Sequence, residues 1–524
     1  MQQQQKGKAM QLWEAYRDTS AIKRAECYAE YTLPYLMVDP LLKSENQTST
    51  ALEKDYQSVG ALLVNNLASK IAGALFPVGI PYFRLQPSPE LLRLAKEQDV
   101  DQATLKSSLV RLAQEASGQV FFSGGMHKLT YMIKLLIVTG MCLVYRDSVK
   151  YQFSVWNLHS FVVRRDAYGD VRDAVLKQRV LYEDLPAPVR AVLGAKSPRK
   201  YTEGMWLDYY THIAYKEGEL NRLVEVYDEV DGHVCGEINT FPEHLSPWKV
   251  LDWNVIIGEN YARGHVEDYA GDFARLSTTS EALGIYEQES LDVLNIVDES
   301  AGASVSDYQS ANTGDYIPGK KDSVTAHEKG DYQKIAAVNA SISGIEQRLG
   351  QAFMYVGQMR NAERVTAEEV RTLAREVENT FGGVYSLLAH NMQTPFAYIS
   401  MYEVRNMQEG ILAGLITRSY RPTIQTGTAA LQRTSEIAGL VNAAQEIGAI
   451  VPVLAQASSR IDPMKLVDKI LLSNNVDLES ISKSAEQIKA EAEQKAAQAN
   501  AVAAASDTLI SNAPGVQEAL QGVQ

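Results

Sequence analysis

The chain has 524 residues, of which 45% are hydrophobic, and a formal net charge of −14 at pH 7. This length and composition exclude a largely disordered chain and leave room for several domains. The acidic balance excludes a protein that wraps nucleic acid on a basic surface, because such binding depends on neutralising phosphates. Cys27, Cys142 and Cys235 are too far apart for a short metal-ligand spacing and too few for a disulfide framework, so we expect buried thiols in a reducing compartment.

Hydrophobic periodicity predicts helices over residues 8–76. Residues 58–76 place their apolar side chains on one helical face, and Pro77 ends this helix because proline has no backbone donor. Two more helices are predicted over 101–145, joined near residues 122–125. The longest apolar stretches of both regions each carry a lysine and are too short or too polar to span a bilayer. We interpret them as core helices and expect no association with a membrane.

Residues 150–257 are rich in aromatic and β-branched residues with turn residues between them, which predicts an antiparallel sheet. Two strands are predicted within 161–182. Asp231-Gly232 lies between two β-prone runs and is the strongest hairpin signal in the chain. A further strand is predicted within 248–258.

The chain is predicted to be helical again over 264–298, followed by a Gly-, Ser- and Asp-rich loop over 301–333 with room for short strands. A heptad seam comes next, in which apolar residues step by three and four positions. Its residues are Ile335, Val338, Ile342, Ile345, Leu349, Ala352 and Val356. Two interpretations stay open at this point: one helix packed on a core, or a helix packed lengthwise on a neighbour such as a second copy of itself.

A capping box follows, formed by Thr366 and Glu369. In this motif the hydroxyl accepts a hydrogen bond from a free backbone N–H and the Glu reaches back to the cap residue. The motif predicts that a helix starts at a defined residue, with Arg360 and Arg364 on the loop just before it. After about residue 430, the abundance of Ala, Gln, Glu and Lys predicts a helical tail.

No motif in the sequence supports catalysis, so we expect no catalytic residue, cofactor or metal. The nearest approach is Gly314–Lys321, which fits a phosphate-binding loop but ends in Lys, where that motif needs the Ser or Thr that holds Mg²⁺. We interpret it as a polar loop. His212 is interpreted as a structural residue of a strand.

Negative charge is concentrated between Glu259 and Arg348, which hold 16 acidic and 7 basic residues and so a net charge of −9. This excess indicates either a solvated acidic surface or an acidic wall that faces something to which it must not adhere.

Four segments, 59–77, 160–171, 258–276 and 363–388, together resemble the portal, or head-to-tail connector, proteins of short-tailed podovirus phages. They occur in the order of that family, within residues 20–390. The resemblance implies an α+β, mainly helical portal fold that assembles as a ring, usually a dodecamer, at one capsid vertex. Viral double-stranded DNA would be packaged and ejected through its channel, and the ring would help to nucleate procapsid assembly.

The resemblance also implies a division into named regions. These are a wing (1–257), a first stem helix region (258–298), a clip (299–333), a second stem helix (334–360), a channel loop with capped helix and wing return (361–430), and a helical crown and tail (431–524).

Specific site residues follow from this division. The heptad residues would pack the stem, and Tyr316, Lys320 and Lys321 of the clip would contact the terminase and later the tail adaptor. Arg360 and Arg364 would form a basic collar that touches DNA in the channel. The alternative for these arginines is local pairing with glutamates beside them.

The implied partners are other copies of the chain, the terminase large subunit, the tail adaptor, the major capsid and scaffolding proteins, internal core proteins at the crown, and DNA in transit without sequence specificity. The implied location is the virion, with assembly in the host cytoplasm. Three other classes stay open: another ring-forming head-tail adaptor, a nucleotide-driven enzyme, and a cellular helical adaptor that needs no ring.

Overall fold

The computed structural model describes most of residues 7–404 and residues 423–425. The gaps within this range are residues 43–54, 80, 88–101 apart from 89, 92, 93 and 97, 198, 219–221, 299, 301–303, 318–319, 321, 323, 329–330, 356–371, 374, 378, 381–382 and 405–422. All described residues belong to the first of two units, Met1–Leu431. Val356, Arg360, Arg364, Thr366, Glu369, Lys321 and the predicted helical tail therefore lie outside the described residues.

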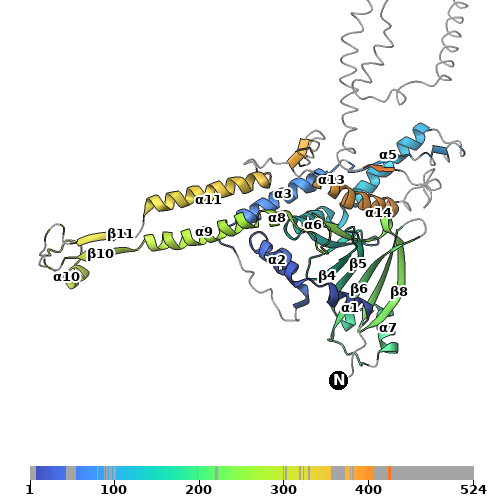
Figure 1. Cartoon of the computed structure of the whole chain (residues 1–524), viewed down its shortest axis with the longest axis horizontal. Coiled ribbons are helices and arrows are strands. Elements are labelled where there is room, and N and C mark those ends of the chain that lie inside the picture. The colour runs from blue at the N-terminus through green and yellow to red at the C-terminus, as the bar shows by residue number, and fades with distance from the viewer. Residues whose placement is uncertain are drawn as a thin grey trace, which may run out of the picture. The chain divides into compact units, whose positions relative to one another are not determined.

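A five-stranded antiparallel sheet confirms the sheet predicted for the middle of the chain (Figure 1). Its strands lie in sequence order: β4 (Phe161–Arg165), β5 (Val171–Leu181), β6 (Trp206–Glu217), β7 (Arg222–Val230) and β8 (His233–Pro242). The predicted hairpin is present, because Asp231 and Gly232 have φ of 47° and 78° and join β7 to β8. Two positive φ values in a two-residue loop match the twist of the paired strands.

A second, three-stranded sheet has the order β3-β2-β9, with β2 (Met141–Asp147), β3 (Gln152–Trp156) and β9 (Trp248–Asp252). β9 confirms the strand expected within 248–258. The helix predicted to run to residue 145 is wrong over its last part, because α6 (Gly125–Thr139) ends there and β2 follows. Gly140 lies between them with φ of 88°, a conformation that ends a helix and that glycine adopts without strain.

Helices pack against these sheets and against each other, with α3 (Val59–Leu75) on α6 and α14 (Thr394–Val404) on α5 (Gln102–Gln119). The remaining described elements of this part are α1 (Lys8–Tyr16), α2 (Thr19–Glu30), α7 (Ala187–Lys196), α13 (Val384–Leu388), the π-helical turn Ala389–Gln393, β1 (Arg84–Gln86) paired with β12 (Thr423–Gln425), and 3-10 turns at Pro34–Met37, Pro40–Leu42, Phe122–Gly124, Tyr182–Asp184 and Glu243–Leu245. None of the described helices combines the length and apolar character needed to cross a membrane.

The described elements between the short helix α8 (His265–Asp268) and α13 form a long helical hairpin. They are α9 (Ala270–Ser290), β10 (Val293–Val297), α10 (Val305–Ser310), β11 (Val324–Glu328) and α11 (Tyr332–Ala352). The helix predicted over 264–298 is therefore wrong at its end, because 293–297 pairs as a strand with β11. The region expected to be a loop with room for short strands contains the short strand β11, and it also contains α10, which was not predicted.

Helix α1 is held on the sheet by the carboxylate of Glu229, which accepts hydrogen bonds from the backbone N–H groups of Ala9 (2.9 Å) and Met10 (3.1 Å). Glu229 is 1% exposed, so its negative charge faces the N-terminal end of the helix dipole without competition from water.

Replacing Glu229 with glutamine should loosen α1. The amide keeps one acceptor but turns an NH₂ group toward a backbone N–H, and we expect a loss of about 1–3 kcal/mol in the free energy of unfolding. Urea denaturation measures the loss, and hydrogen exchange over Lys8–Tyr16 shows whether it is local. Glu225→Gln on the same strand is the control, since Glu225 pairs with the half-exposed Lys216 and should cost less than about 1 kcal/mol. Equal losses in the two variants would contradict this role of Glu229.

Candidate functional site: the helical hairpin and its base

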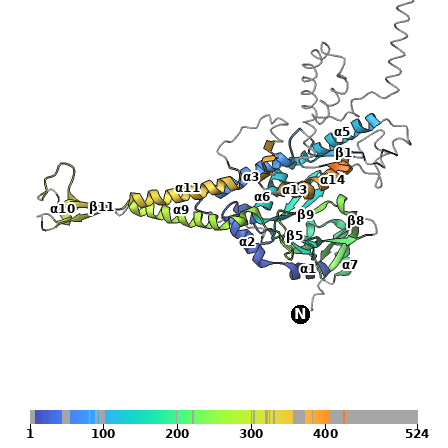
Figure 2. The ribbon, with the colours of Figure 1, turned by 45° about the horizontal axis from the view of Figure 1, so that its top comes forward.

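The two long helices of the hairpin run side by side and lead into β10 and β11 (Figure 2). Polar contacts join them at intervals. Arg348 of α11 forms an ion pair with Asp272 of α9 at 2.7 Å, and Arg275 donates to the hydroxyl of Ser341 at 3.1 Å. The hairpin is therefore one packed unit, and its two helices are fixed in register.

The predicted heptad seam is buried only toward the base of the hairpin. Ile345 and Leu349 are buried, whereas Ile335, Val338 and Ile342 are half-buried. The lower seam thus confirms packing of α11 within its own chain. The exposed part of the upper seam leaves packing on a second copy as a prediction.

Aromatic rings close the base of the hairpin. The ring of Phe353, which directly follows α11, lies 4.8 Å from His265, 5.8 Å from Tyr269 and 5.8 Å from Phe273, measured between ring centroids. Burial lowers the pKa of His265, so its imidazole is neutral at physiological pH. Packing of these rings ties the end of α11 to α8 and the start of α9.

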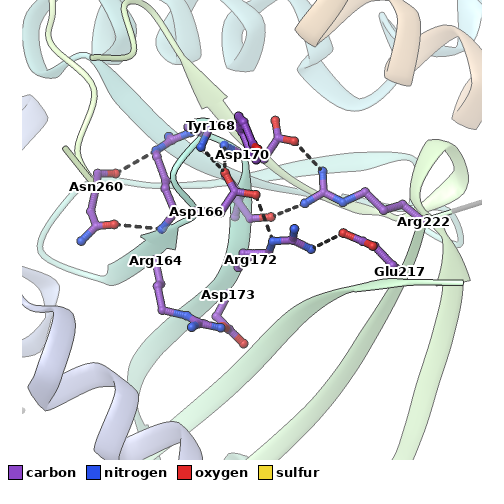
Figure 3. Close-up of polar contacts among 12 residues, drawn as sticks. Arg164, Asp166, Tyr168, Asp170, Arg172, Asp173, Glu217, Arg222 and Asn260 are labelled. Atoms are coloured by element: carbon purple, nitrogen blue, oxygen red, sulfur yellow. Dashed lines mark hydrogen bonds and ion pairs between the residues drawn. The ribbon is translucent and has the colours of Figure 1, made fainter. Parts of the chain in front are cut away.

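Polar contacts tie the same base to the five-stranded sheet, and Figure 3 shows those of Asn260. Arg165, at the end of β4, donates to the backbone carbonyl of Asn260 at 2.9 Å and pairs with the buried Asp252 at 2.6 Å. Burial raises the pKa of Asp252. Arg263 pairs with Glu259 at 2.7 Å, and this contact lowers the pKa of that carboxyl. Arg165 thus bonds the segment before α8 to the sheet, while the Arg263–Glu259 pair lies within that segment.

Farther along the β4–β5 turn, charges of opposite sign alternate (Figure 3). Arg172 pairs with Asp166 at 3.0 Å and with Glu217 at 2.9 Å. Asp173 accepts from both Arg164 and the buried His212, and these partners lower its pKa although burial opposes them. His212 lies in β6, so the expectation that it is a structural residue of a strand is confirmed.

The far end of the hairpin is a two-stranded antiparallel ladder with five residue pairs, from Val293 opposite Glu328 to Val297 opposite Val324. Its surface is unusually apolar for an exposed strand pair. The exposed apolar residues at this end are Leu291, Val293, Leu294, Ile296, Val305, Tyr316 and Val324. Exposed apolar side chains gathered at one end of a chain indicate a surface that another molecule covers.

The loop predicted as a near-miss for phosphate binding lies at this end. Helix α10 comes before Gly314, and strand β11 comes after Lys320. A phosphate-binding loop needs the reverse order, a strand and then a helix whose N-terminus faces the phosphates. The described residues of this loop, 314–317 and 320, lie in neither a helix nor a strand, in agreement with the interpretation as a polar loop. Tyr316 is fully exposed here, and its role with Lys320 in partner binding stays a prediction.

A family model described as bacteriophage head to tail connecting protein matches residues 4–481. The chain belongs to this family. The portal protein of Pseudomonas phage phiKMV is 46% identical over 515 residues, which cover 98% of this chain and 99% of that protein. The portal protein of Enterobacteria phage SP6 is 30% identical over 445 residues, which cover 84% and 83%. The resemblance carried by the four sequence segments is therefore confirmed.

A solved chain from the neck of an empty GTA particle overlaps 80% of this head-to-tail connecting protein and 90% of its own length. Its TM-score of 0.39 and identity of 10% are too low to bear on the fold.

One buried and one part-buried polar contact of this head-to-tail connecting protein have no signal in the sequence. The guanidinium of Arg146 pairs with Glu403 at 3.0 Å across 257 positions, and the ammonium of Lys70 donates to the carbonyl of Met354 at 2.6 Å across 284 positions. Neither pair belongs to a local motif. Only the packing of α3, β2 and α14 brings these residues together.

Proposed function

We propose that this head-to-tail connecting protein is the portal subunit of a short-tailed phage. It forms a structural ring, near a dodecamer, at one capsid vertex, and double-stranded DNA passes through the channel of the ring during packaging and ejection. Its role is structural rather than enzymatic. Family membership and the portal proteins among its relatives support this function.

The observation that carries the proposal is the exposed apolar end of the helical hairpin. Leu294 and Ile296 are 51% and 57% exposed on a strand that has one partner strand in the described part of the chain. Identical subunits in a ring place identical hairpins next to each other, so each copy covers the apolar surface of the next. The half-buried upper seam of α11 is available for the same contact.

Charge supports the passage of DNA. The hairpin lies within the segment of net charge −9, and Glu287 and Glu289 are exposed on α9. An acidic wall repels phosphates, so DNA slides without the many contacts that counterion release stabilises on a basic groove. Arg360 and Arg364 would then form a narrow basic collar, at which a few charge-assisted contacts slow or retain the DNA.

The regional division is kept as part of the proposal: wing 1–257, stem 258–298 and 334–360, clip 299–333, channel loop and wing return 361–430, and crown 431–524. The clip, with Tyr316, Lys320 and Lys321, docks the terminase large subunit and then the tail adaptor. The major capsid and scaffolding proteins are further partners, and the crown meets internal core proteins. The protein is located in the virion after assembly in the host cytoplasm.

Electron microscopy of the purified protein tests the proposal directly. We expect class averages that show closed rings near a dodecamer with an open central hole. Monomers at micromolar concentration, both alone and with scaffolding protein added, would contradict the ring and favour an adaptor that needs none.

Replacing two apolar residues at the hairpin end with aspartate should weaken the association of subunits into a ring. We expect the double substitution Leu294→Asp/Ile296→Asp to weaken subunit association about tenfold or more, because each carboxylate would lose its hydration in the interface. Analytical ultracentrifugation measures the loss. Val149→Asp is the control, since Val149 is 87% exposed in the β2–β3 turn, away from the hairpin. Rings in the double variant at wild-type concentration would show that this end does not join subunits.

A further inference from the structure

Helix α11 ends before its own sequence pattern does. The heptad seam continues through Ala352 to Val356, yet the helix ends at Ala352. The next residues close it with backbone bonds from Met354 N–H to Gln351 (3.2 Å) and from Tyr355 N–H to Gly350 (2.7 Å). Met354 has φ of 54°, the left-handed conformation that glycine normally supplies at this position. Something other than local sequence therefore ends the helix.

Side chains from two other helices contact the carbonyl oxygen of Ala352, the last residue of α11, and those of the two residues after it. His265 of α8 lies with Nε2 3.2 Å from the carbonyl of Ala352. Asn66 of α3 donates to the carbonyls of Phe353 and Met354, both at 3.4 Å. Lys70, one turn later on α3, donates to the carbonyl of Met354 at 2.6 Å. We call Asn66, Lys70 and His265 the terminal clamp.

Lys70 makes the strongest of these contacts. Its bond is the shortest, it is charge-assisted, and the ammonium lies at the negative end of the helix dipole. The neutral His265 and the amide of Asn66 add no charge. The cost of a left-handed non-glycine residue is of the size that one charged hydrogen bond offsets.

Helix α3 also binds the chain after residue 383 through two backbone carbonyls near its C-terminal end. Tyr385 donates through its hydroxyl to the carbonyl of Ala74 at 3.2 Å, and Gln393 donates to the carbonyl of Leu75. α3 thus anchors the last residues before 356 and the first helices after 383. The stretch between these anchors carries Arg360 and Arg364 in the sequence.

We infer that Lys70 is a positioning residue for channel function: by ending α11 at Ala352, it sets where and in which direction the chain leaves the stem toward the two arginines. The functional part of this inference rests on the proposed portal role. The structural part concerns the folded chain alone.

Hydrogen exchange of the purified full chain tests the structural part. In Lys70→Met we expect the amides of Phe353, Met354 and Tyr355 to exchange about tenfold faster, as expected for the loss of one charged hydrogen bond, while the five-stranded sheet is unchanged. Lys70→Arg should restore most of the protection. Lys128→Met, at an exposed position of α6, is the control and should match wild type. Wild-type exchange in Lys70→Met, or no rescue by arginine, overturns the inference.

Particles assembled with each variant test the functional part, with DNA retention after packaging as the measurement. We expect Lys70→Met to form normal rings but to retain less DNA than Lys128→Met, with recovery in Lys70→Arg. Faster exchange with unchanged retention would overturn the positioning role. If the wild-type chain forms no rings, the portal proposal fails instead, and the exchange experiment still decides whether the clamp acts as inferred.

Discussion

Glu403→Gln will lower the free energy of unfolding by about 3–5 kcal/mol, the loss typical of removing one partner of a buried ion pair. The side chains of Arg146 and Glu403 are 2% and 1% exposed. Two bonds join them, Nε to Oε1 at 3.1 Å and Nη2 to Oε2 at 3.0 Å. Glutamine turns an NH₂ group toward the guanidinium and leaves its charge buried without a counterion. Urea denaturation followed by circular dichroism measures the loss.

The matched control is Glu97→Gln, which removes a surface pair with Arg93 at 3.2 Å whose side chains are 56% and 84% exposed. We expect it to cost less than about 1 kcal/mol. The double substitution Arg146→Met/Glu403→Met should recover only part of the stability, because Arg146 also donates to the carbonyls of Gln119 and Tyr151. A cost for Glu403→Gln as small as that of Glu97→Gln would show that water reaches the buried pair.

Gly140→Ala is expected to lower the free energy of unfolding by about 2–4 kcal/mol. Gly140 has φ of 88°, and a Cβ there would lie 2.5 Å from the carbonyl oxygen of Ala262 and 2.5 Å from the carbonyl carbon of Arg263. These are backbone atoms, so they cannot rotate away. Thermal or urea unfolding measures the effect.

Gly79→Ala separates the conformational cost of a left-handed alanine from the steric clash of its Cβ. Gly79 has a similar φ of 81°, but a Cβ there meets nothing within 4 Å. This substitution should therefore lower the free energy of unfolding only by the cost of the left-handed backbone conformation, about 1–2 kcal/mol. If the two substitutions cost the same, the close approach of residues 262–263 to the end of α6 does not contribute.

The sequence predicted those turns and helices whose conformation depends on residues close together in the chain. The Asp231-Gly232 turn specifies its hairpin because positive φ at both positions is needed and available. The strands at 141–147 and 293–297 were missed, because a short apolar run next to a helix fits either structure. Their state is decided by partners distant in the sequence: β9 for the first and β11 for the second.

The same distinction holds at the candidate site. Periodicity identified Ile345 and Leu349, which are buried, because a helix repeats its face every few residues. It also predicted that the helix continues to Val356, whereas α11 ends at Ala352 and Lys70 donates a hydrogen bond to the carbonyl of Met354 two residues later. No spacing rule connects Lys70 with Met354 or Arg146 with Glu403, since each pair is formed only once the chain has folded. The roles of Arg360, Arg364, Tyr316, Lys320 and Lys321 stay predictions.

The uncovered ladder at the end of the hairpin also bears on how the protein is made. A newly synthesised chain presents the apolar strand Val293–Val297 before any neighbour is there to shield it, and such strands promote disorderly association. Subunits that add head to tail form an open filament unless the rotation between neighbouring subunits closes a ring. A closed ring has no free end to which another subunit can add. In the proposed ring, closure is what stops growth, so cells that make the subunit faster than rings close should accumulate insoluble polymer. Slow expression at low temperature should raise the soluble yield for this reason.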